Sequence, residues 1–477
     1  MSIAPSRCSP TPAALFGDLP HSTASVDAAV GRGAPRVQVA QRDQLELRSC
    51  DLDALLAPEH PARTVWAFVE ALDLAALYGA IRALEGHAGR PAIDPKILVA
   101  LWLYATVDGV GSARELDRLC ERDAPYRWLA GGVSLNHHTL ADFRTAQGEW
   151  LDRELTRSLA ALLDRGLVSL EVVAQDGMRV RASAKAARFR RRTRLEELLA
   201  AARAQVEALK AELEADPDAS ARRKQAARTR AAREREERLA AALATLDEIE
   251  RTQAPPRAAT QAGGDDKPPP GASPPSADTN PKQQTQTPER RVSTTDPQAR
   301  VMKMADGGFR PAFNAQLVVD ADTQLIAAVD LVNIGSDMSQ MAPMHEALRT
   351  RYTQTPAHWL ADGGYANLAA IDQLAQAGTQ PCVPVPKSRN PAIDPHQPKP
   401  SDPPAVAAWR QRMAGEAARA LYKRRAASVE CANAQFRRRG FVQLTVRGLA
   451  KARTIVLWHA LAHNLMRMAS LGFLRPA

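Results

Sequence analysis

The stretch that most constrains the fold is residues 171–175, an apolar run that predicts a buried strand. The strand delivers a carboxylate, Asp176, and is predicted to end there and turn at Gly177. The next strand-like segments come only after residue 293, so the block 186–293 is an insertion between core strands. The fold must therefore assemble one sheet from segments that lie far apart in the chain.

Beyond the insertion, strand and helix patterns alternate. In order they predict two strands joined as a hairpin, a helix, a strand, a helix and a strand, at residues 313–319, 325–331, after 339, 358–361, 368–377 and 381–386. Three antiparallel strands followed by strand-helix repeats predict a mixed α/β sheet of the ribonuclease H kind, built from residues 166–185 and 294–471.

The N-terminal part divides into a tail and a helical domain. Residues 1–40 are rich in Ala, Ser, Pro and Gly without periodicity and are predicted to be disordered. Residues 41–165 show helical spacing throughout, including a capping-box pattern at Ser112 and Glu115. A polar connection at 136–138 precedes the last of three helices, which fits a helix-turn-helix module and, equally, a plain helical bundle. The adjacent His137 and His138 are more typical of a surface loop than of metal ligands.

The insertion itself has two parts. Apolar residues alternate four and three apart at Leu195, Leu199, Ala202, Val206, Leu209 and Leu213. This heptad seam, followed by a second charged helix, predicts a coiled-coil insertion over 186–252 that can fold back as a helical hairpin. Residues 253–293 are rich in Pro, Gln, Thr and Ala and are predicted to form a disordered linker.

Charge favours a polyanionic partner. The chain carries 63 Lys and Arg against 53 Asp and Glu, a net charge of +10. The run from Arg179 through Arg181 to Arg194 contains no acid, which suits a phosphate backbone, although in isolation it would also fit a solvated helix start. Five scattered cysteines without a C-x-x-C pair argue against zinc and disulfides. No apolar run has membrane-spanning length, so we expect a cytoplasmic protein without a membrane partner.

Two further acids occupy positions that resemble that of Asp176. Asp362 follows the strand at 358–361 and precedes two glycines, so both aspartates are expected at the edge of a sheet where a ligand can approach. Glu430 lies in a predicted helix over 405–438, seven residues from Lys423 and seven from Arg437. Alone, that pattern fits a solvated charged face.

We expect the three acids to meet in one metal site. Carboxylates are the hard oxygen ligands that Mg²⁺ prefers, and Mn²⁺ can substitute. Such a site can carry out two-metal phosphoryl transfer. The other acids are assigned elsewhere: Asp306, Asp320 and Asp322 to turns, and Asp337, after the third strand, to a supporting position.

Taken in order, these motifs resemble the DDE transposases of bacterial insertion sequences, in the branch with a helical insertion between the first and second acids. The resemblance covers residues 42–471. It rests on the stretches 175–177, 293–297, 302–309, 333–337, 361–365, 422–430, 447–451 and 463–465.

The resemblance implies a role for each matching residue. Asp176, Asp362 and Glu430 would be the catalytic, metal-binding triad, and Tyr422 and Arg425 would help to hold terminal DNA. The family signature has the arginine four residues before the glutamate and a lysine seven after it. Here the first gap is five and the last position is Arg437, which keeps the charge but changes its geometry. The full set of expected DNA contacts is Arg179, Arg181, Tyr422, Lys423, Arg425, Arg437, His138 and Arg144.

The resemblance also implies an activity and partners. Residues 60–150 would recognise terminal inverted repeats, and the enzyme would cleave the element ends with Mg²⁺ and join the freed 3′-hydroxyl to target DNA. Double-stranded DNA would be the partner, bound by a homodimer in the bacterial nucleoid. Two alternatives stay open: a nuclease of the same fold that never joins DNA, and a non-catalytic DNA-binding or regulatory relic.

Overall fold

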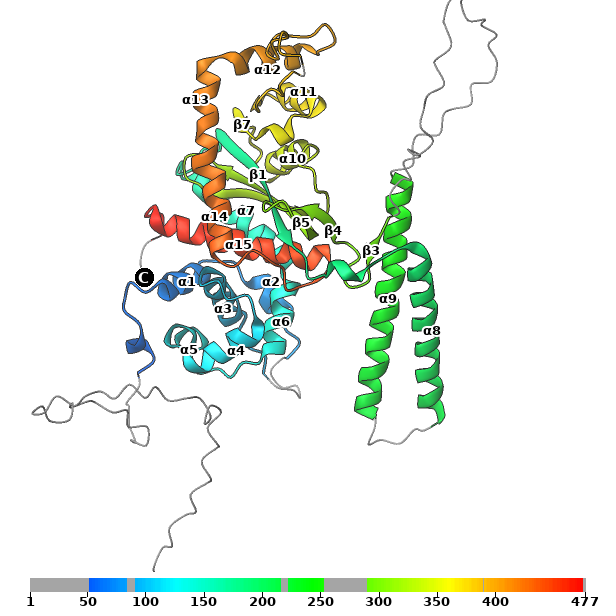
Figure 1. Cartoon of the computed structure of the whole chain (residues 1–477). Helices are drawn as coiled ribbons and strands as arrows, with labels where there is room; N and C mark the ends of the chain where they lie inside the picture. The colour runs from blue at the N-terminus through cyan, green and yellow to red at the C-terminus, as the bar shows by residue number, and fades with distance from the viewer. Residues whose placement is uncertain (1–50, 84–90, 216–221, 253–289, 389, 475–477) are drawn as a thin grey trace, which may run out of the picture. The chain divides into compact units, whose positions relative to one another are not determined.

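The computed structural model describes residues 51–83, 91–215, 222–252, 290–388 and 390–474 (Figure 1). The predicted tail at 1–40 and most of the predicted linker at 253–293 lie outside the described residues. The end of that linker prediction is wrong, because Val292 and Ser293 form strand β3.

The N-terminal helices begin where the sequence provides caps. The Asp94 side chain accepts a hydrogen bond from the backbone N–H of Lys96 at the start of the largely buried helix α3, and Ser112 accepts from that of Glu115 at the start of α4. The elements are η1 (Asp53–Leu55), α1 (Pro61–Glu70), α2 (Ala75–Gly79), α3 (Pro95–Val107), α4 (Ala113–Arg122), α5 (Ala124–Ala130), α6 (His137–Ala146) and α7 (Gly148–Asp164).

Two sequence predictions need correction in this part. Helix α5 lies between α4 and α6, where no separate helix was predicted. The histidine pair is not in a loop, because the Asn136 side chain accepts a hydrogen bond from the backbone N–H of Thr139 and caps α6 one residue before His137.

The core is one mixed sheet. Its strands are β1 (Val172–Arg181), β4 (Arg300–Lys303), β5 (Phe309–Asp320), β6 (Ile326–Val332), β7 (His358–Leu360) and β8 (Gln380–Cys382). The order is β4-β5-β1-β7-β8, with β6 also paired to β5. Strand β5 is antiparallel to both of its neighbours β1 and β6, whereas β7 runs parallel to β1 and β8 runs parallel to β7. Helices α10 (Met341–Tyr352) and α11 (Leu368–Gln376) follow in the predicted alternation. The predicted mixed sheet is confirmed.

Strand β1 does not end at its carboxylate. Asp176 pairs with Leu317 in the middle of the strand, and Gly177 continues the ladder opposite Gln316. The predicted turn at Gly177 is therefore wrong, and the glycine serves another purpose. A Cβ at position 177 would lie 2.6 Å from Nε2 of Gln316 and would also collide with the Asp337 carboxylate. Close packing of polar side chains, not backbone curvature, excludes a larger residue here.

The insertion folds back as predicted. Helices α8 (Arg192–Ala215) and α9 (Arg222–Thr252) pack through Leu195, Leu199 and Ala202 on the first and Leu239, Ala242 and Leu246 on the second. The side chain of Leu213, the last residue of the predicted seam, lies outside the described residues. Strands β2 (Phe189–Arg190) and β3 form a small antiparallel sheet at the root of this hairpin.

The C-terminal segment is helical, with one break. The predicted helix over 405–438 is divided at Gly415 into α12 (Pro404–Ala414) and α13 (Glu416–Arg425), which continues through a π-helical turn (Ala426–Glu430) into α14 (Cys431–Arg438). The last helix, α15 (Leu449–Ser470), contacts α3, α6, α7 and β6.

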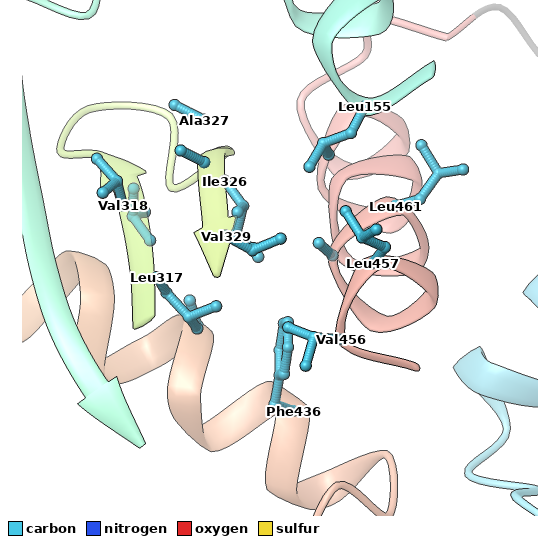
Figure 2. Close-up of a cluster of buried hydrophobic side chains, with 14 of the residues drawn as sticks. Leu155, Leu317, Val318, Ile326, Ala327, Val329, Phe436, Val456, Leu457 and Leu461 are labelled. Carbon is cyan, nitrogen blue, oxygen red and sulfur yellow. The ribbon is translucent and has the colours of Figure 1, made fainter. Parts of the chain in front are cut away.

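Helix α15 closes the core against the edge strand β6. Figure 2 shows Ile326 and Val329 on the strand and Leu457 on the helix, all buried in the same cluster. The Asn464 side chain fixes the contact, because its amide both accepts from the backbone N–H of Ile326 at 2.8 Å and donates to the carbonyl of Ile326 at 2.9 Å. The helix thus satisfies backbone groups that an edge strand would otherwise leave unpaired.

Candidate active site

The three predicted acids gather around one arginine. Arg425 Nη2 lies 2.9 Å from Oδ1 of Asp176 and 3.9 Å from Oδ2 of Asp362, while Nη1 lies 2.9 Å from Oε1 of Glu430. The acids come from the middle of β1, the loop after β7 and the π-helical turn. A single guanidinium therefore links carboxylates that are as much as 254 residues apart (430 − 176).

The π-helical turn explains how a five-residue gap brings Arg425 and Glu430 together. In an α-helix, residues four apart share a face, and a residue five along is rotated away. The wider π turn bonds residue i to i+5 and restores the shared face. The Ser428 hydroxyl, buried in this turn, lies at hydrogen-bond distance from the carbonyl of Arg424 (3.0 Å) and from that of Arg425 (3.1 Å). Glu430 consequently pairs with Arg425.

Asn433 is a member of the site that the sequence analysis missed. Its Nδ2 donates to Oδ2 of Asp176 at 2.7 Å, so both oxygens of Asp176 are engaged. The signal was present in the sequence, because Asn433 lies three residues after Glu430 and hence on the same helical face. Amides are common enough on helices that this spacing alone did not distinguish it.

Asp362 is held by the short turn that follows it. Its side chain caps the 3₁₀ turn Gly363–Tyr365 by accepting from the backbone N–H of Gly364 at 2.8 Å. A Cβ on Gly364 would lie 3.0 Å from that same carboxylate oxygen, so the glycine allows the close approach. The other oxygen of Asp362 stays on the side of Arg425.

A buried polar network joins the strand of Asp176 to the turn of Asp362. Gln175, next to Asp176, receives a hydrogen bond from the Trp359 indole at 3.0 Å and donates to Oε1 of Gln316 at 2.9 Å. The hydroxyl of Tyr365 donates to the same Gln316 oxygen at 2.6 Å. These buried hydrogen bonds link β1, β5, β7 and the turn after β7. Hydrogen bonds are stronger in the interior of a protein than in water.

The network ends at a fourth acid. Asp337 accepts from Asn314 at 2.7 Å and from Gln316 at 2.8 Å, and its second oxygen lies 3.4 Å from Arg179. The expectation of a supporting position for Asp337 agrees with these contacts. Arg179 also donates to the Gly335 carbonyl at 2.7 Å.

Burial shapes the charge state of the cluster. Burial raises the pKa of Asp176 and the neighbouring Asp362 adds to this, although Arg425 opposes it. Burial alone would lower the pKa of Arg425, but the Asp176 carboxylate raises it overall, so the guanidinium stays charged. Three carboxylates against one guanidinium leave a formal charge of −2 in this cluster. Such an excess of carboxylate oxygen attracts a hard divalent cation.

A metal ion would need a rearrangement of this cluster. Among the residues that the structure describes, no three His, Cys, Asp or Glu side chains are arranged so that they could hold a metal ion as they stand. The three acids face the position taken by the Arg425 guanidinium instead. The donor set itself, two aspartates and a glutamate, fits Mg²⁺ or Mn²⁺.

The remaining predicted contacts to DNA fall into two groups. Arg181, Lys423, Arg437 and His138 are exposed, and Tyr422 and Arg179 are half-buried. Arg144 is different, because only 7% of it is exposed. Its guanidinium lies 4.6 Å from the Trp102 ring centroid and donates to the carbonyl of Gly111. Arg144 therefore packs inside the helical domain and is withdrawn as a DNA contact.

Two family models match the chain. The model described as a transposase DDE domain matches residues 282–465, and a second, described as a transposase domain (DUF772), matches residues 50–146. The first interval contains Asp362 and Glu430, whereas Asp176 lies before it. No curated protein and no solved structure matches the chain.

The two matches together support a DDE-type transposase of the insertion-sequence type. The DDE transposase family implies an enzyme that cleaves DNA and transfers strands, and it typically uses a divalent metal. None of the helices in the described ranges has an apolar stretch of membrane-spanning length.

Proposed function

We propose that this transposase cuts an insertion sequence from DNA and joins it to a target through Asp176, Asp362 and Glu430 acting as one site. The observation that carries the proposal is their convergence on Arg425 from three separate elements. A structural salt-bridge network would need no such arrangement, because Arg425 could be neutralised by one neighbouring acid on its own helix.

We also propose that the catalytic sheet is ribonuclease H-like. The strand order β6-β5-β1-β7-β8, antiparallel over the first three and parallel over the last two, supports this assignment. Asp176 lies on the central strand β1 and Asp362 directly after its parallel neighbour β7, so the two acids stand side by side.

When bound, Mg²⁺ would activate the attacking water or 3′-hydroxyl and stabilise the leaving oxygen of the phosphodiester. The triad carboxylates would hold it. Asn433 keeps Asp176 oriented toward the site. Arg425 balances the acids in the absence of metal and would be free to contact the DNA backbone once they are otherwise neutralised.

The DNA itself would be held by residues around this site. Tyr422, Lys423 and Arg437 belong to the helices that carry Glu430, and Arg179 and Arg181 to the strand of Asp176. We propose that the helical domain, with exposed His138 on α6, recognises terminal inverted repeats. Joining two element ends would require a homodimer on DNA.

The test is cleavage and strand transfer on labelled duplexes carrying the element's ends, with Mg²⁺ or Mn²⁺. The parent is compared with Asp176→Ala, Asp362→Ala and Glu430→Ala. The proposal predicts that the parent cuts and joins, whereas each variant binds the duplex and does neither. A parent that cuts without joining indicates the nuclease alternative, and one that binds without cutting indicates the non-catalytic relic.

A further inference from the structure

A basic cavity lies where the helical hairpin meets the core, apart from the acid cluster. Its volume is about 540 Å³. Five of its lining residues are cationic and none is acidic; the cations are Lys185, Arg188, Arg235, Arg238 and Arg447. Like charges gathered around one space repel each other unless an anion occupies it.

The cavity is lined by five separate segments, of which three are tied together by backbone hydrogen bonds. The N–H of Thr294 donates to the carbonyl of Arg188 at 3.1 Å, which joins the segment after β1 to the segment after β3. The N–H of Leu444 donates to the carbonyl of Arg181 at 2.8 Å, which holds the segment that carries Arg447. The other two segments are the helices of the hairpin: α8 supplies Leu198, and α9 supplies Arg235 and Arg238. Lys185, Arg188 and Arg447 are thus carried by segments that backbone hydrogen bonds hold together.

Most of this charge is not used inside the protein. Within the described residues, Lys185, Arg188 and Arg447 form no ion pair, and all three are exposed, although the charge of Arg447 opposes the rise that burial causes in the pKa of the nearby Asp296 carboxyl. Arg238 has a loose pair with Glu234 at 3.8 Å. On the same hairpin, by contrast, Arg192 pairs closely with both Asp247 and Glu250. The cavity is therefore a place where hairpin and core leave cations available.

The lining favours a phosphate backbone over a nucleotide or a base. Hydroxyls of Ser183, Thr294 and Thr295 line the cavity with the cations, and such groups are typical donors to phosphate oxygens. No aromatic side chain lines it, so it offers no surface on which a base would stack.

Strand β1 carries Asp176 of the proposed cleavage site, and the segment after it lines the cavity. Ser183 lies seven residues after Asp176 and two residues beyond the end of β1, so at about 3.3 Å per residue the two are at most about 23 Å apart. Duplex DNA rises about 3.4 Å per base pair, so this distance corresponds to about seven base pairs.

We propose that this cavity binds the phosphate backbone of duplex DNA about seven base pairs from the scissile phosphate. The position along the DNA rests on the proposed function of the acid cluster, whereas binding of the backbone does not. The hairpin insertion would thereby act as a second clamp on the DNA that the active site cuts.

The test compares two triple variants of the full-length protein. Lys185→Gln/Arg188→Gln/Arg447→Gln removes three cavity cations. Lys224→Gln/Arg230→Gln/Arg233→Gln removes one lysine and two arginines that are exposed on α9 and do not line the cavity. Binding of a labelled duplex spanning an element end is measured without divalent metal over a range of KCl concentrations. Unchanged thermal melting shows that each variant is folded.

Each phosphate contact contributes about 0.9 to the slope of log affinity against log salt. We expect the magnitude of this slope to fall by about two to three in the cavity variant, whose affinity should fall at least about tenfold. In the control variant the slope should change by less than about one. Equal losses in the two variants would overturn the proposal.

A second measurement separates this inference from the proposed chemistry. On a duplex that ends about four base pairs from the cleavage position on the cavity side, the cavity variant should bind as well as the parent. If the parent never cleaves DNA but the cavity variant still loses its salt slope, the clamp stands and the catalytic proposal falls. If Asp176→Ala alone abolishes cleavage while the cavity variant binds every duplex like the parent, the catalytic proposal stands and the clamp falls.

Discussion

Replacing Arg425 with alanine is expected to destabilise the metal-free protein and to strengthen metal binding. The side chain of Arg425 is 9% exposed and that of its partner Asp176 is 17% exposed, so the pair is largely buried. Removing one partner of a buried ion pair costs about 3–5 kcal/mol. The acids Asp362 and Glu430 are 44% and 53% exposed, and their contacts add about 0–1 kcal/mol each.

Part of this cost is relieved by protonation. Burial raises the pKa of Asp176 even with Arg425 present, and loss of the guanidinium would raise it further. We therefore expect a loss of about 2–4 kcal/mol in the free energy of unfolding without divalent metal. A metal at 100 times its Kd contributes about 2.7 kcal/mol, so saturating Mg²⁺ should remove much of the deficit.

The assay is urea unfolding in EDTA and in saturating Mg²⁺, combined with a Mn²⁺ titration followed by electron paramagnetic resonance. The matched control is Arg424→Ala, the adjacent arginine, whose guanidinium pairs with Asp322 at the surface. The control should lose less than 1 kcal/mol in both conditions. The reasoning is refuted if Arg425→Ala loses the same stability with and without Mg²⁺ and binds Mn²⁺ no more tightly than the parent.

Three further predictions concern the frame of the site. Gly177→Ala forces a methyl group against Gln316 and Asp337 and should cost about 1–3 kcal/mol in urea unfolding, whereas Gly363→Ala, which has open space around its Cβ, should cost less. Asn464→Ala leaves the buried N–H and carbonyl of Ile326 unpaired and should cost about 2–4 kcal/mol in the same assay; a neutral result would contradict the edge-strand role. Burial lowers the pKa of His463 to about 4, so the unfolded chain binds its proton first as the pH falls. Stability is fully present above about pH 6.5 and should fall by up to about 1.4 kcal/mol per pH unit toward pH 4; His463→Gln, which keeps a donor for the Gln324 carbonyl, should flatten that fall.

The sheet and the hairpin were predictable because their signals are local and periodic. Apolar runs joined by the turn residues 320–323 marked β5 and β6, and a heptad spacing marked α8, so the mixed sheet and the folded-back helices followed. The acids were predictable as individuals, because Asp176 and Asp362 each follow an apolar run and adjoin a glycine. The extent of β1 was not predictable, because a glycine in the sequence can either turn the chain or make room for a neighbouring side chain. Gly177 makes room for Asp337.

The interior of the site depends on contacts between distant residues and left no local signal. Gln175, Gln316 and Tyr365 look like ordinary polar residues until three strands bring them together. The positive charge of Arg144 suggested a DNA contact, but its guanidinium lies over the buried Trp102 ring and donates to the Gly111 carbonyl. The five-residue gap before Glu430 departs from the family signature, and the π turn that brings Glu430 to Arg425 across this gap has no local signal in the sequence.

The central claim is that Asp176, Asp362 and Glu430 act as one catalytic unit, and a double-variant cycle of DNA cleavage rates tests it most directly. Residues that act together show effects that do not add, because removing one already disables the rest. We predict that Asp176→Ala/Glu430→Ala cleaves element-end DNA no more slowly than either single variant. A double variant whose loss equals the product of two independent partial losses would contradict the claim.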